Sequence, residues 1–234
     1  VHEGDWLMSR ILFDLCGADD RRFSPYCWRT KMALGHKGLD FTTEPVRFTE
    51  KSKLEFSGQE KVPVLDDGGT VVHDSWNIAE YLEDTYSDAP ALFPGPEGRL
   101  LAKQTNEWMD GLHRQLMTFI IFDVYQRLDV QDQAFFRPTR EERYGGTLEE
   151  LQAGRDQSIG DFRANGLAAL RAHLLDREYI CGKTPAYGDY IVFGSLQWAR
   201  LTSEFDVLAP DDPVFSWRER MIARADEMGL SAPA

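Results

Sequence analysis

Near the start of the chain, hydrophobic and polar residues alternate over Arg10–Leu15, which predicts a β-strand. After a polar loop, Ser24 and Pro25 suit the N-cap and the first position of a helix, and Gly38 is suited to end it. Two parallel strands joined by such a helix are expected to form a right-handed crossover. The pattern then predicts a second strand and a short irregular helix, at Phe41–Val46 and Glu50–Phe56.

A β-hairpin is predicted next, with strands Val62–Leu65 and Val71–His73 around the turn Asp67-Gly68-Gly69. Pro63 has no N–H to donate to a neighbouring strand, so it belongs at the edge or the start of a strand, often after a cis bond. The backbone of Val62 is therefore expected to be free to pair with an extended ligand.

An amphipathic helix is predicted directly after the hairpin, with Asp74 and Ser75 at its entry. Its hydrophobic positions follow helical spacing at Trp76, Ile78, Ala79, Tyr81 and Leu82. The N-terminus of a helix carries partial positive charge, so this point of the chain favours a carboxylate.

The composition then changes to a segment rich in proline and glycine, SDAPALFPGPEG, which indicates a linker at residues 87–98. Everything after it is predicted to be helical, and FFRPTREERYGG is interpreted as a connection between the first two helical segments. The predicted segments are Arg99–Asp129 (as one helix or two), Leu148–Leu175, Tyr187–Leu201 and Pro213–Met228.

The sequence thus predicts an α+β protein of two domains, with an α/β unit at residues 9–86 and an all-α bundle at residues 99–230. Residues Val1 to Leu7 precede Met8 and Ser9 and are interpreted as an upstream extension outside the fold. No run of about 20 hydrophobic residues is present, so no membrane span is expected.

Charge and cysteine content narrow the functional classes. The 234 residues carry a formal net charge of −13, which disfavours binding to nucleic acids and to anionic membrane surfaces. Three cysteines without metal-binding spacing predict free thiols, a reducing cytoplasm and no metal site. An anionic ligand would need local positive charge, which gives interest to Lys51, Lys53 and Lys61.

Two segments, FSPYCWRTKMALGHKG and KVPVLDDGGTVVHDSWNIAEYLED, together resemble the glutathione transferases. The resemblance implies a thioredoxin-like first domain, an all-α second domain, glutathione as co-substrate and a homodimer. It also implies that Val62, next to Pro63, binds the cysteinyl backbone of glutathione and that Asp74 and Ser75 hold the γ-glutamyl end. Lys61 matches a position that reaches toward the glycyl end.

Ser24 is the candidate catalytic residue, because its hydroxyl and the helix N-terminus could stabilise the thiolate of glutathione. Ser24 could also be only a helix cap, and Arg21, Arg22 or Tyr26 could contribute instead. Thiol–disulfide exchange is disfavoured, because Ser24 stands where a C-x-x-C motif has its nucleophilic cysteine. Cys27 is expected to be a buried, inert thiol.

Aromatic and methionine side chains in the predicted helices are candidates for a second-substrate pocket. Each could equally be a core residue, but together they exceed what helices can bury, which suggests an aromatic cleft between the domains. The candidates are Tyr26, Trp108, His113, Met117 and Trp198.

Within the family, FSPYCWRTK, HDSWNIAEYLED and PAYGD resemble the bacterial glutathione-dependent β-aryl etherases of lignin breakdown, which are similar to a fungal class. Such enzymes attack the carbon beside a ketone and release a phenol. Ala186 stands where the family usually has a Ser or Thr before the helix-capping Asp189, so one cap hydrogen bond is expected to be missing, or replaced by Thr184 or water. The alternatives are a general transferase for aromatic electrophiles and a non-catalytic ligand-binding protein.

Overall fold

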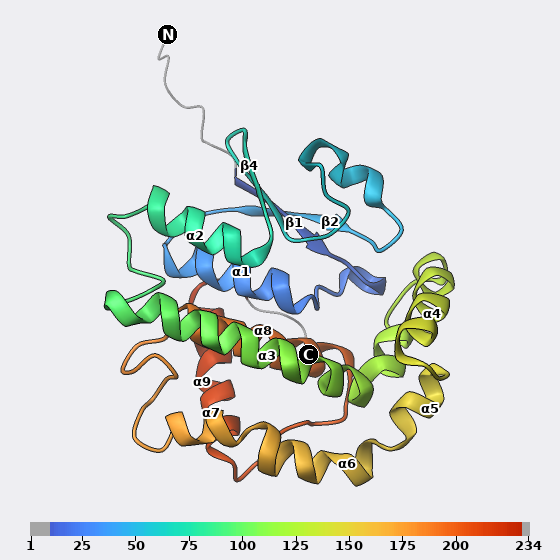
Figure 1. Cartoon of the computed structure of the whole chain (residues 1–234). Coiled ribbons are helices and arrows are strands. Elements are labelled where there is room, and N and C mark those ends of the chain that lie inside the picture. Colours follow the sequence, from blue (N-terminus) through green and yellow to red (C-terminus); the bar gives the residue numbers. More distant parts are fainter. Residues whose placement is uncertain (1–9, 231–234) are drawn as a thin grey trace.

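The first domain is built around a mixed sheet of four strands in the order β2-β1-β3-β4. The computed structural model describes residues 10–230, so residue 9 and the predicted extension Val1 to Leu7 lie outside it. Strands β1 and β2 are parallel, and β3 is antiparallel to both of its neighbours, with α1 and α2 on one face of the sheet (Figure 1). The elements are β1 (Arg10–Leu15), η1 (Ala18–Asp20), α1 (Pro25–His36), β2 (Thr42–Val46), η2 (Lys51–Ser57), β3 (Val64–Asp67), β4 (Thr70–His73) and α2 (Ser75–Thr85).

Local sequence signals explain most of these elements. The Ser24 side chain accepts a hydrogen bond from the backbone of Cys27 at the start of α1, and Gly38 adopts φ +67° just after the end of α1. The hairpin turns at Gly68 and Gly69, both with positive φ. The Val62–Pro63 peptide bond is cis, as predicted, and lies immediately before β3.

The second domain is all helical, which confirms the predicted fold class (Figure 1). Its longest helix, α3, begins at Gly95, inside the segment predicted to be linker, and runs unbroken to Gln126. The elements are α3 (Gly95–Gln126), α4 (Val130–Tyr144), α5 (Leu148–Ala153), α6 (Arg155–Asp161), the π-helical turn η3 (Phe162–Gly166), α7 (Ala168–His173), α8 (Tyr187–Thr202) and α9 (Pro213–Glu227).

Two predictions for this domain were wrong. The segment FFRPTREERYGG lies mostly in α4, although Pro138 in its interior cannot donate a helix hydrogen bond. The helix tolerates Pro138 because Pro138 and Ala134, the residue one turn earlier, are both exposed, so water can satisfy the unpaired carbonyl group. The predicted helix Leu148–Leu175 is broken into α5, α6, η3 and α7, with Gly154 at the first break.

Helix α8 lies at the centre of the molecule and packs against α1 on one side and α3 on the other. The crossing with α1 is unusually close. A Cβ atom at Gly194 would lie 2.3 Å from the carbonyl oxygen of Pro25, in the first turn of α1. Only glycine therefore lets α8 approach the start of α1 at this distance.

Asp189, at the start of α8, organises the segment that precedes the helix. Its buried carboxylate accepts hydrogen bonds from the backbone N–H groups of Ile180, Cys181 and Ala186 at 2.8, 3.3 and 3.1 Å. The indole N–H of Trp217 on α9 donates a fourth at 3.0 Å. Ala186 provides no side-chain cap, as predicted, and Thr184 donates no replacement hydrogen bond within the described residues. Asp189 therefore connects the start of α8 to α9 in addition to capping α8.

We expect Gly194→Ala to destabilise the protein by about 1–3 kcal/mol, because the added methyl group must push the first turn of α1 away from α8. Urea unfolding measures the change. Gly111→Ala is the matched control, since no atom lies within 4 Å of a Cβ at this position in α3. That variant should gain up to about 1 kcal/mol from helix propensity. Equal stability of the two variants would contradict a tight α1–α8 crossing.

Candidate active site

Ser24 lies at the N-terminus of α1 and is 3% exposed. Its Oγ accepts a hydrogen bond from the backbone N–H of Cys27 at 3.2 Å, so Ser24 is indeed a helix cap. This bond uses an oxygen lone pair and leaves the hydroxyl hydrogen free to donate to another group. Cys27 is fully buried, and burial raises the pKa of its thiol well above the ordinary value. Ser24 can therefore cap the helix and still donate to an anion.

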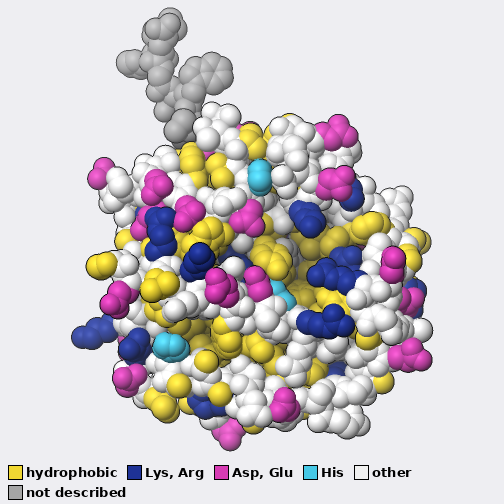
Figure 2. Space-filling model, viewed as in Figure 1, with side chains coloured by type: hydrophobic (Ala, Val, Ile, Leu, Met, Phe, Trp, Pro, Cys, Tyr) yellow, Lys and Arg dark blue, Asp and Glu magenta, His cyan; other side chains and the backbone are white. Residues whose placement is uncertain are grey.

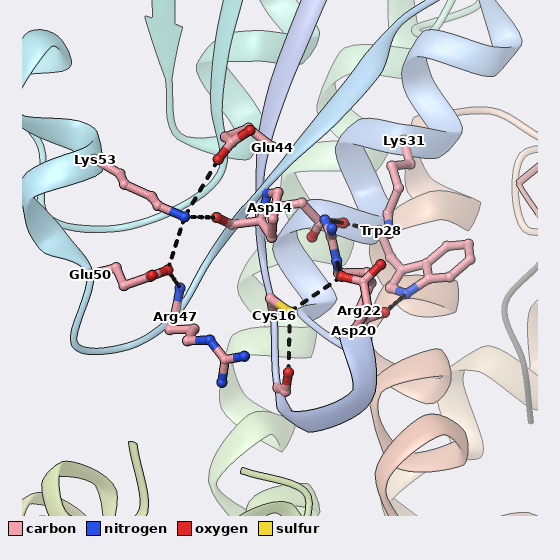
Figure 3. A network of polar contacts seen from close by, with 12 residues as sticks. Asp14, Cys16, Asp20, Arg22, Trp28, Lys31, Glu44, Arg47, Glu50 and Lys53 are labelled. Carbon is pink, nitrogen blue, oxygen red and sulfur yellow. Dashed lines mark hydrogen bonds and ion pairs between the residues drawn. The ribbon is translucent and has the colours of Figure 1, made fainter. Parts of the chain in front are cut away.

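The loop before Ser24 is held by a buried polar network (Figure 3). Asp14 on β1 is buried and accepts a hydrogen bond from the Lys31 ammonium at 2.9 Å, while the Arg22 guanidinium lies 3.6 Å from the same carboxylate. Arg22 also pairs with Asp20 at 2.6 Å, and its carbonyl oxygen accepts the indole N–H of Trp28 at 2.9 Å. The network ties the loop both to the sheet and to α1.

The same loop is fixed to the helical domain by hydrogen bonds to two carbonyl groups. The backbone N–H of Ala18 donates to the carbonyl of Arg127 at 2.8 Å, and the Arg21 guanidinium donates to the carbonyl of Leu201 at 2.8 Å. Arg21 and Arg22, which the sequence offered as alternatives to Ser24, are thus both engaged in structural contacts. The position of Ser24 depends on both domains.

Val62, Pro63, Asp74 and Ser75 form a continuous strip beside the N-terminus of α2. The carbonyl of Pro63 accepts the backbone N–H of Asp74 at 3.3 Å, and Val62 forms no hydrogen bond within residues 10–230. Asp74 is exposed, and its carboxylate accepts the N–H groups of Trp76 and Asn77 at 2.9 and 3.2 Å. The structure therefore brings together the four strip residues that the sequence predicted.

The three candidate lysines differ in their ion pairs. Lys51 pairs with Glu60 at 2.6 Å, and Lys53 lies 3.2 Å from Glu50 and also near Glu44. Lys61 is exposed, adjoins Val62 in the chain and forms no ion pair in the part of the chain that the structure describes. Its charge is available to a ligand.

A hydrogen-bonded chain connects α1, α3 and α8 next to Ser24. The hydroxyl of Tyr26 lies 3.2 Å from His113 Nδ1, and His113 Nε2 lies 3.1 Å from Ser195 Oγ. The Ser195 hydroxyl also lies 3.3 Å from the carbonyl oxygen of Ile191. When Ser195 donates to that carbonyl, its oxygen accepts from Nε2–H and Nδ1 accepts from the Tyr26 hydroxyl. The Tyr26 hydroxyl is thus held by His113.

Three of the predicted pocket residues form one cluster. Trp198 packs edge-on against the His113 ring with centroids 5.7 Å apart, and the Tyr26 and His113 rings also pack edge-on. Trp108 and Met117 lie half-buried against the hydrophobic core, and Trp108 makes no aromatic contact with the cluster within the described residues. The place of Trp108 and Met117 in the pocket stays a prediction.

Arg29, which the sequence analysis did not single out, lies directly beneath the site. It is 2% exposed, stacks over the Tyr26 ring at 4.7 Å and donates to the Asn106 side chain at 2.6 Å. Its Nε and Nη2 atoms have no hydrogen-bond partner in residues 10–230, and burial lowers the pKa of the guanidinium. The only sequence signal was its position three residues, about one helical turn, after Tyr26.

Cavities, metal-binding clusters and membrane-spanning helices add no further site in the described residues. Two surface cavities of about 200 and 230 Å³ share Ser203, Glu204 and Phe205 in their lining, and neither is lined by Ser24, Val62 or Ser75. Residues 10–230 contain no group of three or more His, Cys, Asp or Glu side chains placed to hold a metal ion. Among the described helices, none combines the length and the apolar character that a membrane span requires.

Burial and the positive charge of Arg29 lower the pKa of His113 to about 4. The unfolded chain protonates His113 below about pH 6.5, so the folded state should lose about 2 kcal/mol through this residue between pH 7.5 and 4.5. Urea unfolding at both pH values should show a smaller loss for His113→Asn than for the parent. His173→Asn, on α7, is the control. Parallel losses in all three proteins would contradict a neutral, buried His113.

Comparison with known proteins places the chain in a family. Family models of the glutathione S-transferase N-terminal and C-terminal domains match residues 23–85 and 102–212. Glutathione S-transferase U28 of Arabidopsis thaliana is 26% identical over 208 residues, which cover 86% of this chain and 81% of that protein.

Solved structures share the same fold. A glutathione S-transferase of Ceriporiopsis subvermispora in complex with glutathione has a TM-score of 0.80 at 22% identity and covers 97% of this chain and all of its own. The β-etherase LigF from Sphingobium sp. strain SYK-6 has a TM-score of 0.68 at 19% identity, with 95% and 99% of the two chains covered. The N-terminal and C-terminal family models match the two domains of the chain in the expected order, so the chain belongs to the glutathione S-transferase family.

Proposed function

We propose that this protein is a glutathione-dependent β-aryl etherase. The observation that carries the proposal is that Ser24 caps the N-terminus of α1 in the domain that also holds the cis Val62–Pro63 bond and the Asp74 cap of α2. In the proposal the Ser24 hydroxyl lies next to the strip of Val62, Asp74 and Ser75. The structural likeness to LigF and to a fungal transferase that binds glutathione supports it. The sequence resemblance described above favours the etherase subclass over other members of the family.

Glutathione would lie along the strip with each of its charges matched. Its γ-glutamyl ammonium group would pair with the exposed carboxylate of Asp74, and the neighbouring carboxylate would take the Ser75 hydroxyl at the N-terminus of α2. The cysteinyl backbone would pair with the unbonded N–H and C=O groups of Val62, held in place by Pro63. Lys61 would meet the glycyl carboxylate.

Activation of the thiol requires a moderate change of pKa. A free thiol has a pKa near 8.5, and lowering it by about two units needs roughly 2.7 kcal/mol. Three features of the site would lower the pKa of the thiol by stabilising the thiolate: a hydrogen bond from Ser24, the N-terminus of α1 and the nearby charge of Arg29. Tyr26 contributes less in this scheme, because its hydroxyl is engaged in a hydrogen bond with His113.

In the proposed reaction the thiolate sulfur attacks the carbon that carries an aryloxy group beside a ketone. A carbon–sulfur bond forms, the carbon–oxygen bond breaks, and the leaving phenolate takes a proton from solvent. The adjacent carbonyl activates the carbon, and positioning of the thiolate provides most of the catalysis. The aryl groups would lie against Tyr26, His113 and Trp198. The reaction as written needs no metal ion.

We also propose a homodimer in the cytoplasm. Cys16, Cys27 and Cys181 are free thiols, which suits the reducing compartment where glutathione is abundant. Light scattering measures the mass in solution, and a single monomer mass of 26.8 kDa would contradict the dimer. The net charge of −13 continues to disfavour nucleic acids and anionic membranes as partners.

A general transferase for aromatic electrophiles is the second candidate function. The similarity to the plant transferase U28 over 86% of the chain favours it, and the glutathione strip would serve either reaction equally well. A non-catalytic ligand-binding protein is disfavoured, since Ser24 keeps a hydroxyl hydrogen available beside the strip.

Incubation with glutathione and a β-aryloxy ketone, followed by chromatography, should show one phenol released for each glutathionyl ketone formed. Conjugation of 1-chloro-2,4-dinitrobenzene without phenol release would instead identify a general transferase. Calorimetric binding of glutathione with no turnover of either substrate would identify a ligand-binding protein. No binding of glutathione at all would remove the whole proposal.

Ser24→Ala should lower kcat/KM by about 10- to 100-fold near pH 6.5, because one hydrogen bond to a charged group is lost. The loss should shrink toward pH 9, where the thiol ionises unaided, and the ultraviolet titration of bound thiolate should shift to higher pH. Ser24→Thr, which keeps the hydroxyl, should restore most activity. Unfolding measurements check the loss of the cap, about 1 kcal/mol. An unchanged pH profile would assign the role to other groups.

A further inference from the structure

Three arginines on α3 and α4 have no acidic partner in the part of the chain that the structure describes. Arg114 lies on α3, and Arg140 and Arg143 lie on α4; together they are called the arginine wall. Within residues 10–230 none of the three forms an ion pair, whereas Arg137 on α4 pairs with Glu141 and Glu149. Acidic residues are in excess in this chain of net charge −13, yet none of the described ones pairs with these three guanidinium groups.

Aromatic rings, rather than carboxylates, hold the guanidinium groups of the arginine wall. Arg114 and Arg143 lie over the Tyr144 ring at 5.3 and 5.7 Å from its centroid. Arg140 lies over Phe136 and Phe48 at 4.6 and 5.4 Å and, within the described residues, donates only to its neighbour Thr139. Stacking through the face of the guanidinium leaves N–H groups at its edges free to bind an anion.

The wall is fixed to both domains. Phe48, beneath Arg140, belongs to the loop after β2, and its N–H donates to the buried carboxylate of Asp132 on α4 at 3.0 Å. The N–H of Thr49 donates to the same carboxylate at 3.0 Å. Helix α4 is therefore tied to the glutathione-binding domain, and the cations are held at a set distance from it.

Helix α4, which carries two arginines of the wall, lies on the right of the molecule in Figure 1. Burial raises the pKa of Tyr26. The charges of Arg29 and Arg143 act on that hydroxyl in the opposite direction, and the charges of Asp110 and Asp74 act in the same direction as burial. Figure 2 shows a recess in this face of the molecule with hydrophobic side chains at its floor, Lys and Arg side chains on the right and Asp and Glu side chains on the left. The recess thus has a basic and an acidic side.

We propose that the arginine wall binds a carboxylate on the second substrate, so that the preferred electrophile is an aromatic acid. The guanidinium fork matches a carboxylate in two parallel hydrogen bonds. Without local cations, an anionic substrate would be repelled by the excess of negative charge. Glu142 is the nearest carboxylate in sequence, and it is exposed and forms no ion pair with Arg143 in the described structure. This inference rests on the proposed function, because the glutathione site determines where the second substrate meets the thiolate.

A matched pair of aryl chlorides tests the wall independently of etherase activity. In 4-chloro-3-nitrobenzoate and 4-chloro-3-nitrobenzamide, the glutathione thiolate adds at the carbon bearing chlorine, chloride leaves, and the thiol proton passes to solvent. Each rate is divided by its uncatalysed rate. We expect the acid to be preferred by about tenfold, since a charge-assisted pair is partly exposed here, and the preference to fall with added salt.

Arg143→Gln and Arg140→Gln should lower kcat/KM for the benzoate by about tenfold and change that for the benzamide and the KM for glutathione by less than about twofold. Arg177→Gln is the control, since Arg177 is exposed, outside the wall and next to Asp176 in sequence. Equal losses for acid and amide, or no preference in the parent, would overturn the proposal. A raised KM for glutathione alone would assign the wall to the glycyl carboxylate and overturn it as well.

If the protein turns over neither chloride, calorimetry with 4-phenoxybenzoate and 4-phenoxybenzamide in the presence of glutathione decides the question. The acid should bind about tenfold more tightly than the amide, and Arg143→Gln should abolish the difference. Equal affinities for the acid and the amide would overturn the proposal that the arginine wall binds a carboxylate. Absence of phenol release from β-aryloxy ketones, together with a retained preference for acids, would reject only the etherase reaction.

Discussion

The site depends on where the first turn of α1 is held. Ser24 caps this turn, Tyr26 lies on it and Arg29 follows it directly. Gly194 allows α8 to pack against the Pro25 carbonyl. The preceding loop is tied to β1 through Asp14 and to the helical domain through Arg127 and Leu201. A shift of α1 would therefore move the thiol-activating hydroxyl and one wall of the aromatic pocket together.

Charge is the second constraint. An acidic chain that binds an anionic tripeptide must place positive potential locally, and the described structure does so in several ways. The N-termini of α1 and α2 contribute partial charges, Lys61 has no ion pair, and Arg29 is buried below the Tyr26 ring. The arginine wall extends the same arrangement to the far side of the recess. Positive charge is thus concentrated on one side of the proposed reaction centre in a protein that otherwise repels anions.

The sequence predicted the first domain well because its signals are local. A cap at Ser24, a glycine turn after β3 and the acid-serine pair before α2 each act within a few residues. Helix α4 was missed because Pro138 usually breaks a helix, and only its exposure in the folded protein makes it tolerable. The contact of Tyr26 with His113 joins residues far apart in sequence, so it follows from the packing of α1 on α3 and α8 and could not be predicted. The burial of Arg29 also follows from this packing and could not be predicted from the sequence.

A crystal structure of the protein in complex with glutathione tests the central claim most directly. The account predicts that the cysteinyl backbone pairs with Val62 and that the sulfur lies within about 3.5 Å of Ser24 Oγ, with no closer polar side chain. A tripeptide bound away from the strip, or a sulfur directed at Tyr26 or at another residue instead of Ser24, would contradict it.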